Sequence, residues 1–170
     1  MGYTTPRTWN AETVTNEKWI VELKDNLNAI KDPPSQNYEA NEGTDYTKTL
    51  AAWANVDTDY NFSITTTGGD VLIGFMGTLL VSGGGLSKVG YLDVAVDGTR
   101  IINTTDGGLG VVLITGLVSF TRLVTGLAAG VHTFNLQWKP EDGANTITLY
   151  AGAGTASYDL HPQFWVRELT

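Results

Sequence analysis

Histidine and cysteine are the first side chains to test for catalysis or metal binding. The chain has two histidines, His132 and His161, and no cysteine. His132 alternates with the apolar residues Phe134 and Leu136 on one predicted strand face, which indicates a structural role. His161 precedes a proline and is predicted to lie in a loop. Two isolated histidines do not form a zinc site, so we expect no metal and no cofactor.

Acidic residues raise two further possibilities, calcium binding and glycoside cleavage. Residues 57–61 imitate the start of an EF-hand loop, but Phe62 stands where that loop requires glycine. A looser calcium site in the acidic loops, including Asp57 and Asp59, stays open. Asp93 and Asp97 are predicted to share one strand face, but exposed acids on strands are common, so they give a glycosidase little support.

Glycine-rich segments and nucleophile motifs do not add an active site. Residues 83–88 (GGGLSK) lack the Gly-Lys order of a phosphate-binding loop, and a strand is predicted to follow them. The sequence contains no Gly-x-Ser-x-Gly elbow. We therefore predict that the protein is not an enzyme.

Aromatic side chains at loops and strand ends are candidates for ligand contact, because sugar-binding sites present ring faces beside hydrogen-bonding groups. The candidates by position are Tyr60, Tyr91, Tyr150 and Tyr158. Packing inside the fold is the alternative for each of them.

The charge balance narrows the range of partners. The formal net charge is −8 and no basic patch is visible, which disfavours nucleic acid. The apolar run at residues 111–118 is too short to cross a membrane, and residues 1–12 do not resemble a signal peptide. We expect synthesis in the cytoplasm of the producing cell, with any other location reached by assembly or lysis.

Residues 15–34 are predicted to form a helix with one narrow apolar stripe. The apolar residues recur at the spacing of a coiled-coil seam (Ile20, Leu23, Leu27 and Ile30), and Trp19 is predicted to join them in the contact between subunits. Thr15 can cap the helix, and Pro33 and Pro34 stop it. A stripe this short does not stabilise an isolated helix. Since isoleucine occurs at both kinds of seam position, we predict a trimer through these residues and one side of the following body.

The helix separates a short arm from a β-rich body. Residues 1–14 show no period but contain Tyr3, Arg7 and Trp9, which suits either a tail or an arm that docks on another protein. Residues 35–46 are polar and acidic and are interpreted as a linker. Residues 47–170 contain eight to ten alternating apolar segments separated by turn signals, which predicts an all-β antiparallel sandwich, jelly roll or barrel.

Two of these predicted strands are apolar on both faces. Residues 70–81 and 111–124 both show this pattern, the second with a bulge near Gly116. Such strands need a cover beyond the sandwich core, and contact between subunits would supply it.

The chain resembles structural proteins of phage virions in two regions. Residues 6–34 (PRTWNAETVTNEKWIVELKDNLNAIKDPP) resemble an N-terminal segment of tail-fibre and minor virion proteins. The body resembles the trimeric jelly-roll head of phage fibres, which is similar to tumour necrosis factor and complement-type heads. The segments that carry this likeness are residues 53–75, 91–100, 119–139 and 162–169.

The resemblance implies a homotrimer located on the virion, with no catalytic residues. We expect residues 1–14 to be an attachment arm, residues 15–34 a trimeric helical base and residues 47–170 a jelly-roll head. In the leading interpretation a short fibre or spike attaches through Tyr3, Arg7 and Trp9 to capsid or tail proteins and meets a host glycan or protein. The alternatives are a capsid decoration protein and a secreted carbohydrate-binding module.

Overall fold

The structure is a computed structural model of the chain, and it describes residues 16–40, 43–86, 88–152 and 160–169. These residues form one helix, α1 (Asn16–Lys31), and twelve strands. The strands are β1 (Ser35–Glu39), β2 (Tyr46–Lys48), β3 (Ala54–Asn55), β4 (Asn61–Thr66), β5 (Gly69–Gly83), β6 (Val89–Val96), β7 (Thr99–Arg100), β8 (Gly110–Leu113), β9 (Thr115–Leu127), β10 (Gly130–Pro140), β11 (Asn145–Leu149) and β12 (Gln163–Leu169).

The strands form two antiparallel sheets, which confirms the all-β sandwich preceded by a short helix. In the first sheet β1, β12, β5 and β9 lie in that order, and β11 and β2 extend it beside the far half of β5. In the second sheet the order is β4, β10, β6 and β8, with β3 and β7 as short additions. The chain passes repeatedly from one sheet to the other, which is the jelly-roll connectivity. We call these the β5 sheet and the β10 sheet.

The core lies between the two sheets and is built from alternate residues of the long strands. Its largest fully buried side chains include Trp138, Phe134 and Phe164. Phe62 and Phe164, from opposite sheets, stack with ring centroids 4.8 Å apart. Burying each large apolar side chain contributes roughly 1.5–3 kcal/mol to folding, so this layer supplies the stability that positions every surface feature below.

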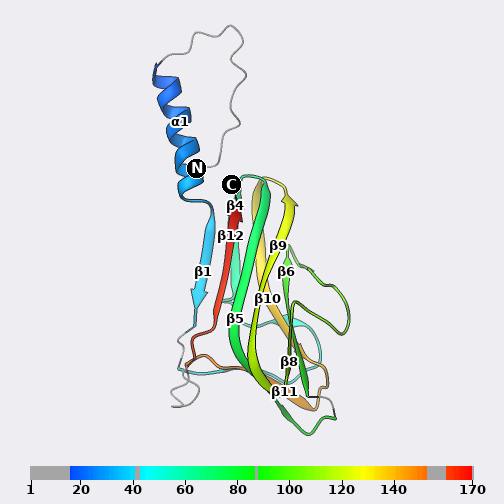
Figure 1. Ribbon diagram of the computed structural model, residues 1–170. Coiled ribbons are helices and arrows are strands. Elements are labelled where there is room, and N and C mark those ends of the chain that lie inside the picture. Colours follow the sequence, from blue (N-terminus) through cyan, green and yellow to red (C-terminus); the bar gives the residue numbers. More distant parts are fainter. Residues whose placement is uncertain (1–15, 41–42, 87, 153–159, 170) are drawn as a thin grey trace.

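Helix α1 ends where its sequence predicts. Asp32, Pro33 and Pro34 follow Lys31, and β1 begins at the next residue. The Glu168 N–H donates to the Pro34 carbonyl at 2.9 Å, which joins this turn to β12. In Figure 1 α1 extends beyond one end of the sandwich, above β1 and near the end of β12.

The prediction that residues 35–46 form a linker is wrong for much of this segment. Ser35–Glu39 forms β1, which pairs with β12 along its whole length, and Ala40 is fully buried. The strand is polar because it is an edge strand whose side chains are largely exposed, so its backbone pairing leaves no apolar alternation in the sequence. The helix is therefore attached directly to the sandwich through a paired strand.

Candidate functional site

The predicted helical seam lies open in the single chain. Ile20, Leu23, Leu27 and Ile30 are 63%, 47%, 55% and 57% exposed. The side chain of Trp19 lies outside the part of the chain that the structure describes. Four aliphatic side chains in a row, each about half exposed, form an apolar surface that a partner helix could bury.

A second apolar surface lies on the outer face of the β5 sheet. Alternate residues of β5 point into the core, and the others point outward, where Met76 is 44% exposed. Leu117 and Leu123 of β9 share this outer face and are 66% and 41% exposed. The strand at residues 70–81 is therefore apolar on both faces, as its sequence indicates, and the outer apolar face is only partly covered within the chain.

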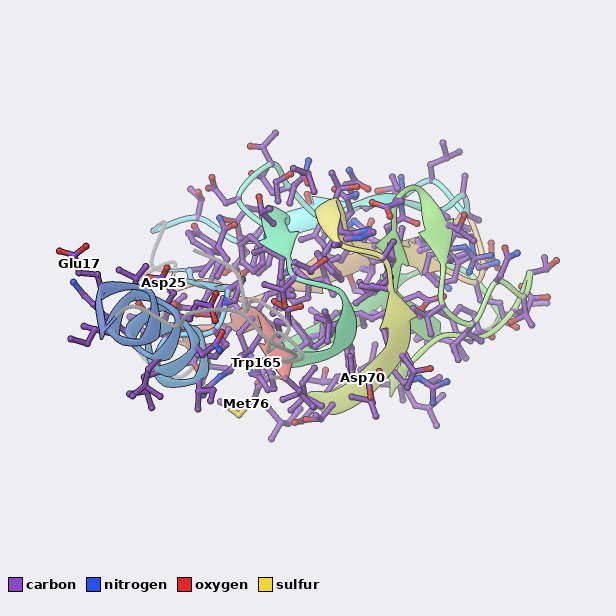
Figure 2. All side chains as sticks on the ribbon, turned by 90° about the horizontal axis from the view of Figure 1, so that it is seen from above. Glu17, Asp25, Asp70, Met76 and Trp165 are labelled. Atoms are coloured by element: carbon purple, nitrogen blue, oxygen red, sulfur yellow. The ribbon has the colours of Figure 1, made fainter. Side chains whose placement is uncertain are left out.

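Trp165 lies flat on this outer face. Its indole ring occupies the space above Gly74, where an added Cβ would approach the ring carbons to 2.1 Å. Gly74 and Trp165 are direct cross-strand partners, and Met76 lies one position further along the same face. Figure 2 shows Trp165 and Met76 on the same side of the molecule. The glycine thus allows the ring to lie against the sheet, and this contact was not predicted from the sequence.

The segment expected as one bulged strand at residues 111–124 is two strands, and this expectation is corrected. β8 pairs with β6 in one sheet and β9 pairs with β5 in the other, so the chain changes sheets at Ile114. Ile114 adopts a φ of 65°, and its N–H donates to the Lys88 carbonyl at 3.1 Å. The sequence shows the apolar pattern on both sides but no glycine, proline or asparagine at this corner, and therefore no recognisable turn signal.

The corner exposes a row of aliphatic side chains. We define the β8–β9 ridge as Val111, Leu113, Ile114 and Leu117, which are 50%, 66%, 60% and 66% exposed. On the inner side of the same corner, the Cβ that Gly110 lacks would lie 2.4 Å from a methyl group of Val118. The corner is thus tightly packed inside and apolar outside.

Two of the four predicted ligand-facing tyrosines are buried, so the prediction is wrong for those two. Tyr60 is fully buried, with its ring centroid 5.1 Å and 5.5 Å from those of Tyr38 and Tyr46. Tyr91 is also buried, and Tyr150 is half-buried. Tyr158 lies outside the described residues. Packing of the rings, rather than contact with a ligand, explains the positions of Tyr60 and Tyr91.

A buried ionic cluster lies on part of the outer face of the β10 sheet. Asp93, expected as an exposed strand acid, is fully buried, and it accepts hydrogen bonds from the N–H groups of Val94 and Ile102 at 2.8 Å and 3.2 Å. Arg100 lies 3.5 Å from the Asp93 carboxylate and 4.1 Å above the Trp53 ring. Burial raises the pKa of Asp93 above its ordinary value, against the opposing pull of these backbone N–H groups and Arg100.

The same cluster continues through Lys139, which is buried and binds Asp106 at 2.8 Å. Asp106 lies in the loop between β7 and β8. Gly108 of the same loop leaves no room for a Cβ, because the backbone of Leu92 lies against it. Burial, followed by the nearby Glu141, raises the pKa of the Tyr91 hydroxyl. The paired charges therefore fasten the loop at residues 101–109 to the sheet, and they are already neutralised by one another.

His132 has the structural position that its sequence pattern predicts. Its Nδ1 lies 2.7 Å from Asp97 Oδ2, and its Nε2 lies 2.9 Å from the Ala128 carbonyl oxygen. Both neighbours are acceptors, so only the protonated ring donates to both. Hydrogen bonding to Asp97 and Ala128 raises the pKa of His132, and hydrogen bonding from His132 and Thr133 lowers the pKa of Asp97.

The acidic residues considered for calcium form a local turn. Asp57 accepts hydrogen bonds from the Thr58 hydroxyl at 3.0 Å and from the Asp59 N–H at 3.2 Å. Across the described residues, no three histidine, aspartate or glutamate side chains are grouped to bind a metal ion. Helix α1, the helix in the described part of the chain, is not long and apolar enough to cross a membrane. The predicted attachment residues Tyr3, Arg7 and Trp9 lie outside the described residues.

Comparison with known proteins gives no family. No protein-family model matches the chain, and no curated protein matches its sequence. Among solved structures, a carbohydrate-binding module of family CBM35 from Paenibacillus barcinonensis is 21% identical, with a TM-score of 0.31. The match covers 67% of this chain and 97% of the chain of that module. A pentameric capsid protein from metagenomic phage sequences is 15% identical, with a TM-score of 0.28. The match covers 97% of this chain and 88% of the chain of that capsid protein. TM-scores this low do not bear on function.

Proposed function

We propose that this chain is a homotrimeric structural protein of a phage virion, in which α1 forms the base and the jelly roll forms the head. The observation that carries the proposal is the open helical seam of Ile20, Leu23, Leu27 and Ile30. A sixteen-residue helix that extends from the sandwich gains stability when such a stripe is buried against copies of itself. Assembly is therefore the role that this element supports.

The direct connection from α1 to β1 supports the same proposal. Because β1 is paired along its length with β12, a helical base would hold each head in a defined place. The virion location rests on the resemblance of residues 6–34 and of the body to phage structural proteins. In this proposal residues 1–14 attach the trimer to the particle, and the head faces outward toward a host surface.

Replacement of the seam leucines tests the helical base. The double variant Leu23→Asp, Leu27→Asp places charge on a surface that must be desolvated in a bundle, so the trimer should weaken and the sedimenting mass at micromolar concentration should fall. Val21→Asp is the matched control, because Val21 is 55% exposed but lies outside the seam. Equal effects of the two changes would argue against the seam, and a wild-type chain that sediments at 18.3 kDa would overturn the trimer.

A further inference from the structure

The β8–β9 ridge has apolar side chains on both of its flanks. Val111 and Leu113 lie on the β10-sheet side, as cross-strand partners of Tyr91 and Val89. Leu117 lies on the β5-sheet side, opposite Thr78. Ile114 stands at the crest between them. The ridge is thus the edge of a wedge whose two sides are both suited to contact with protein.

The ridge is also free of charge, in contrast to the chain as a whole. Residues 107–121 contain no acidic or basic residue, although the chain carries 28 charged residues and a net charge of −8. Copies of an acidic protein repel one another except where their contact surfaces are neutral. The charge-depleted and apolar character of this segment is that of the central part of a protein–protein interface.

The backbone at the crest is strained. A β-branched residue at φ 65° is unusual, because its Cβ crowds the backbone in the left-handed conformation. Glycine would remove that crowding, but it would also remove the exposed side chain at the crest. An exposed isoleucine held in this conformation points to a use for its side chain at the surface.

We infer that the β8–β9 ridge is the contact between heads, and that its occupant is the ridge region of the neighbouring copies. This inference rests on the proposed trimer. A three-fold assembly needs two different surfaces on each copy, which meet along the symmetry axis, and a wedge with two apolar flanks meets that requirement. Ile114 then lies nearest the axis, with the Val111 side of one copy against the Leu117 side of the next.

The position of the ridge fits a trimer held together at two places. In Figure 1 β8 lies in the half of the sandwich far from α1, and β9 runs from there back toward the helix end. The helical seam would hold three copies at one end, and the ridge would hold the three heads at the other. The two contacts lie at opposite ends of the molecule, so each can be removed by mutation without changing the residues of the other.

A single cysteine tests the ridge, because the native chain has none. In full-length Ile114→Cys, three thiols should meet near the axis, so oxidation should give a covalent dimer on a denaturing gel. Val131→Cys is the matched control, since Val131 is 67% exposed but belongs to β10 outside the ridge, and it should not cross-link. The thiol introduced at position 114 should also react about tenfold more slowly with a maleimide when the protein concentration is raised and most chains are in trimers. In a trimer the thiol is covered, so the reaction requires dissociation.

The outcomes separate the two proposals. Cross-linking and concentration-dependent protection at position 114, but not at position 131, would support the ridge contact. A trimeric mass together with a thiol at position 114 that neither cross-links nor becomes protected would overturn the ridge inference and leave the helical base standing. A thiol at position 114 that neither cross-links nor becomes protected, together with a monomeric mass, would overturn both the ridge inference and the proposed trimer. Full reactivity at every protein concentration is also what a ridge that docks on lipid or on an unrelated protein would show.

An acidic residue on the ridge gives a second measurement. Leu117 is 66% exposed, so Leu117→Asp should fold with an unchanged far-ultraviolet circular dichroism spectrum. In the Ile114→Cys background it should abolish the cross-link, because a carboxylate at position 117 would be buried without a partner against the apolar Val111 side of the next copy. An undiminished cross-link would show that the heads do not meet at this surface.

Discussion

At the scale of single residues, Asp97 and His132 join two turns of the β10 sheet. Asp97 lies in the tight turn between β6 and β7 with a φ of 49°, and it also accepts a hydrogen bond from the Thr133 N–H at 2.8 Å. His132 reaches from the start of β10 to this carboxylate and to the Ala128 carbonyl. The pair is partly exposed, so its contribution to stability is modest, about 1 kcal/mol or less.

The two pKa shifts predict a pH window for that contribution. The pKa of His132 is raised, so its stabilisation is complete below the ordinary value of 6.5 and is lost as the pH rises through the folded value. The pKa of Asp97 is lowered, so its stabilisation is complete above the ordinary value of 3.8 and is lost as the pH falls through the folded value. The pair should therefore stabilise the fold most between about pH 4 and 6.5.

Replacement of the histidine checks this window. His132→Gln should lower the Tm more at pH 5 than at pH 8, when both proteins are compared by thermal unfolding in the same buffers. His161→Gln is the matched control for the loss of an imidazole outside this pair. A Tm difference between wild type and His132→Gln that is equal at the two pH values would show that protonation of this ring does not contribute to stability.

At the scale of elements, the corner from β8 to β9 depends on a missing side chain. Gly110 and Val118 face each other across the inside of the corner, and Phe120 lies 3.4 Å from the position of the absent Cβ. Gly116 lies in β9 just after the corner, and the nearest atom to the position of its absent Cβ is a methyl group of Val112 at 3.9 Å, an ordinary contact. The two glycines therefore have different structural roles despite their similar sequence settings.

Alanine substitution should separate these roles. Gly110→Ala forces a methyl group into a filled space and should destabilise the protein by about 1–3 kcal/mol. Gly116→Ala meets only ordinary contacts and should leave the midpoint of urea unfolding nearly unchanged. Similar midpoints for the two variants would mean that Val118 repacks without cost and that the corner is less tightly packed than the structure shows.

At the scale of the whole molecule, the proposed division of labour places attachment in residues 1–14. In this proposal Tyr3 and Trp9, aromatic residues of the kind that protein–protein interfaces favour, insert into a groove on another protein. The helix seam and the β8–β9 ridge both lie after this segment, so assembly of the trimer does not require it.

Deletion of residues 1–14 tests that division. The shortened protein should remain a folded trimer by sedimentation, but it should fail to incorporate into particles when incorporation is measured by gel densitometry of purified virions. The full-length chain, assembled in parallel, is the control. Incorporation at the full-length level would assign attachment to the jelly roll and would favour a capsid decoration protein over a fibre.

The sequence by itself determined the features that depend on local patterns. Apolar alternation and turn signals predicted the antiparallel sandwich, and the spacing of Ile20 to Ile30 followed by two prolines predicted helix α1 and its end. His132 was predicted as structural because it lies in an apolar alternation, and the structure supplies its two acceptors. These features need only neighbouring residues to define them.

The tertiary structure alone decided the features that depend on partners far apart in the chain. Polar β1 is a strand because β12, more than a hundred residues later, pairs with its backbone. Asp93 is buried because the loop at residues 101–109 folds over it, and Tyr60 is buried because Tyr38 and Tyr46 surround it. Ile114 forms a corner without a turn residue because β8 and β9 belong to different sheets, and hydrogen bonds from outside the corner hold its backbone in the left-handed region.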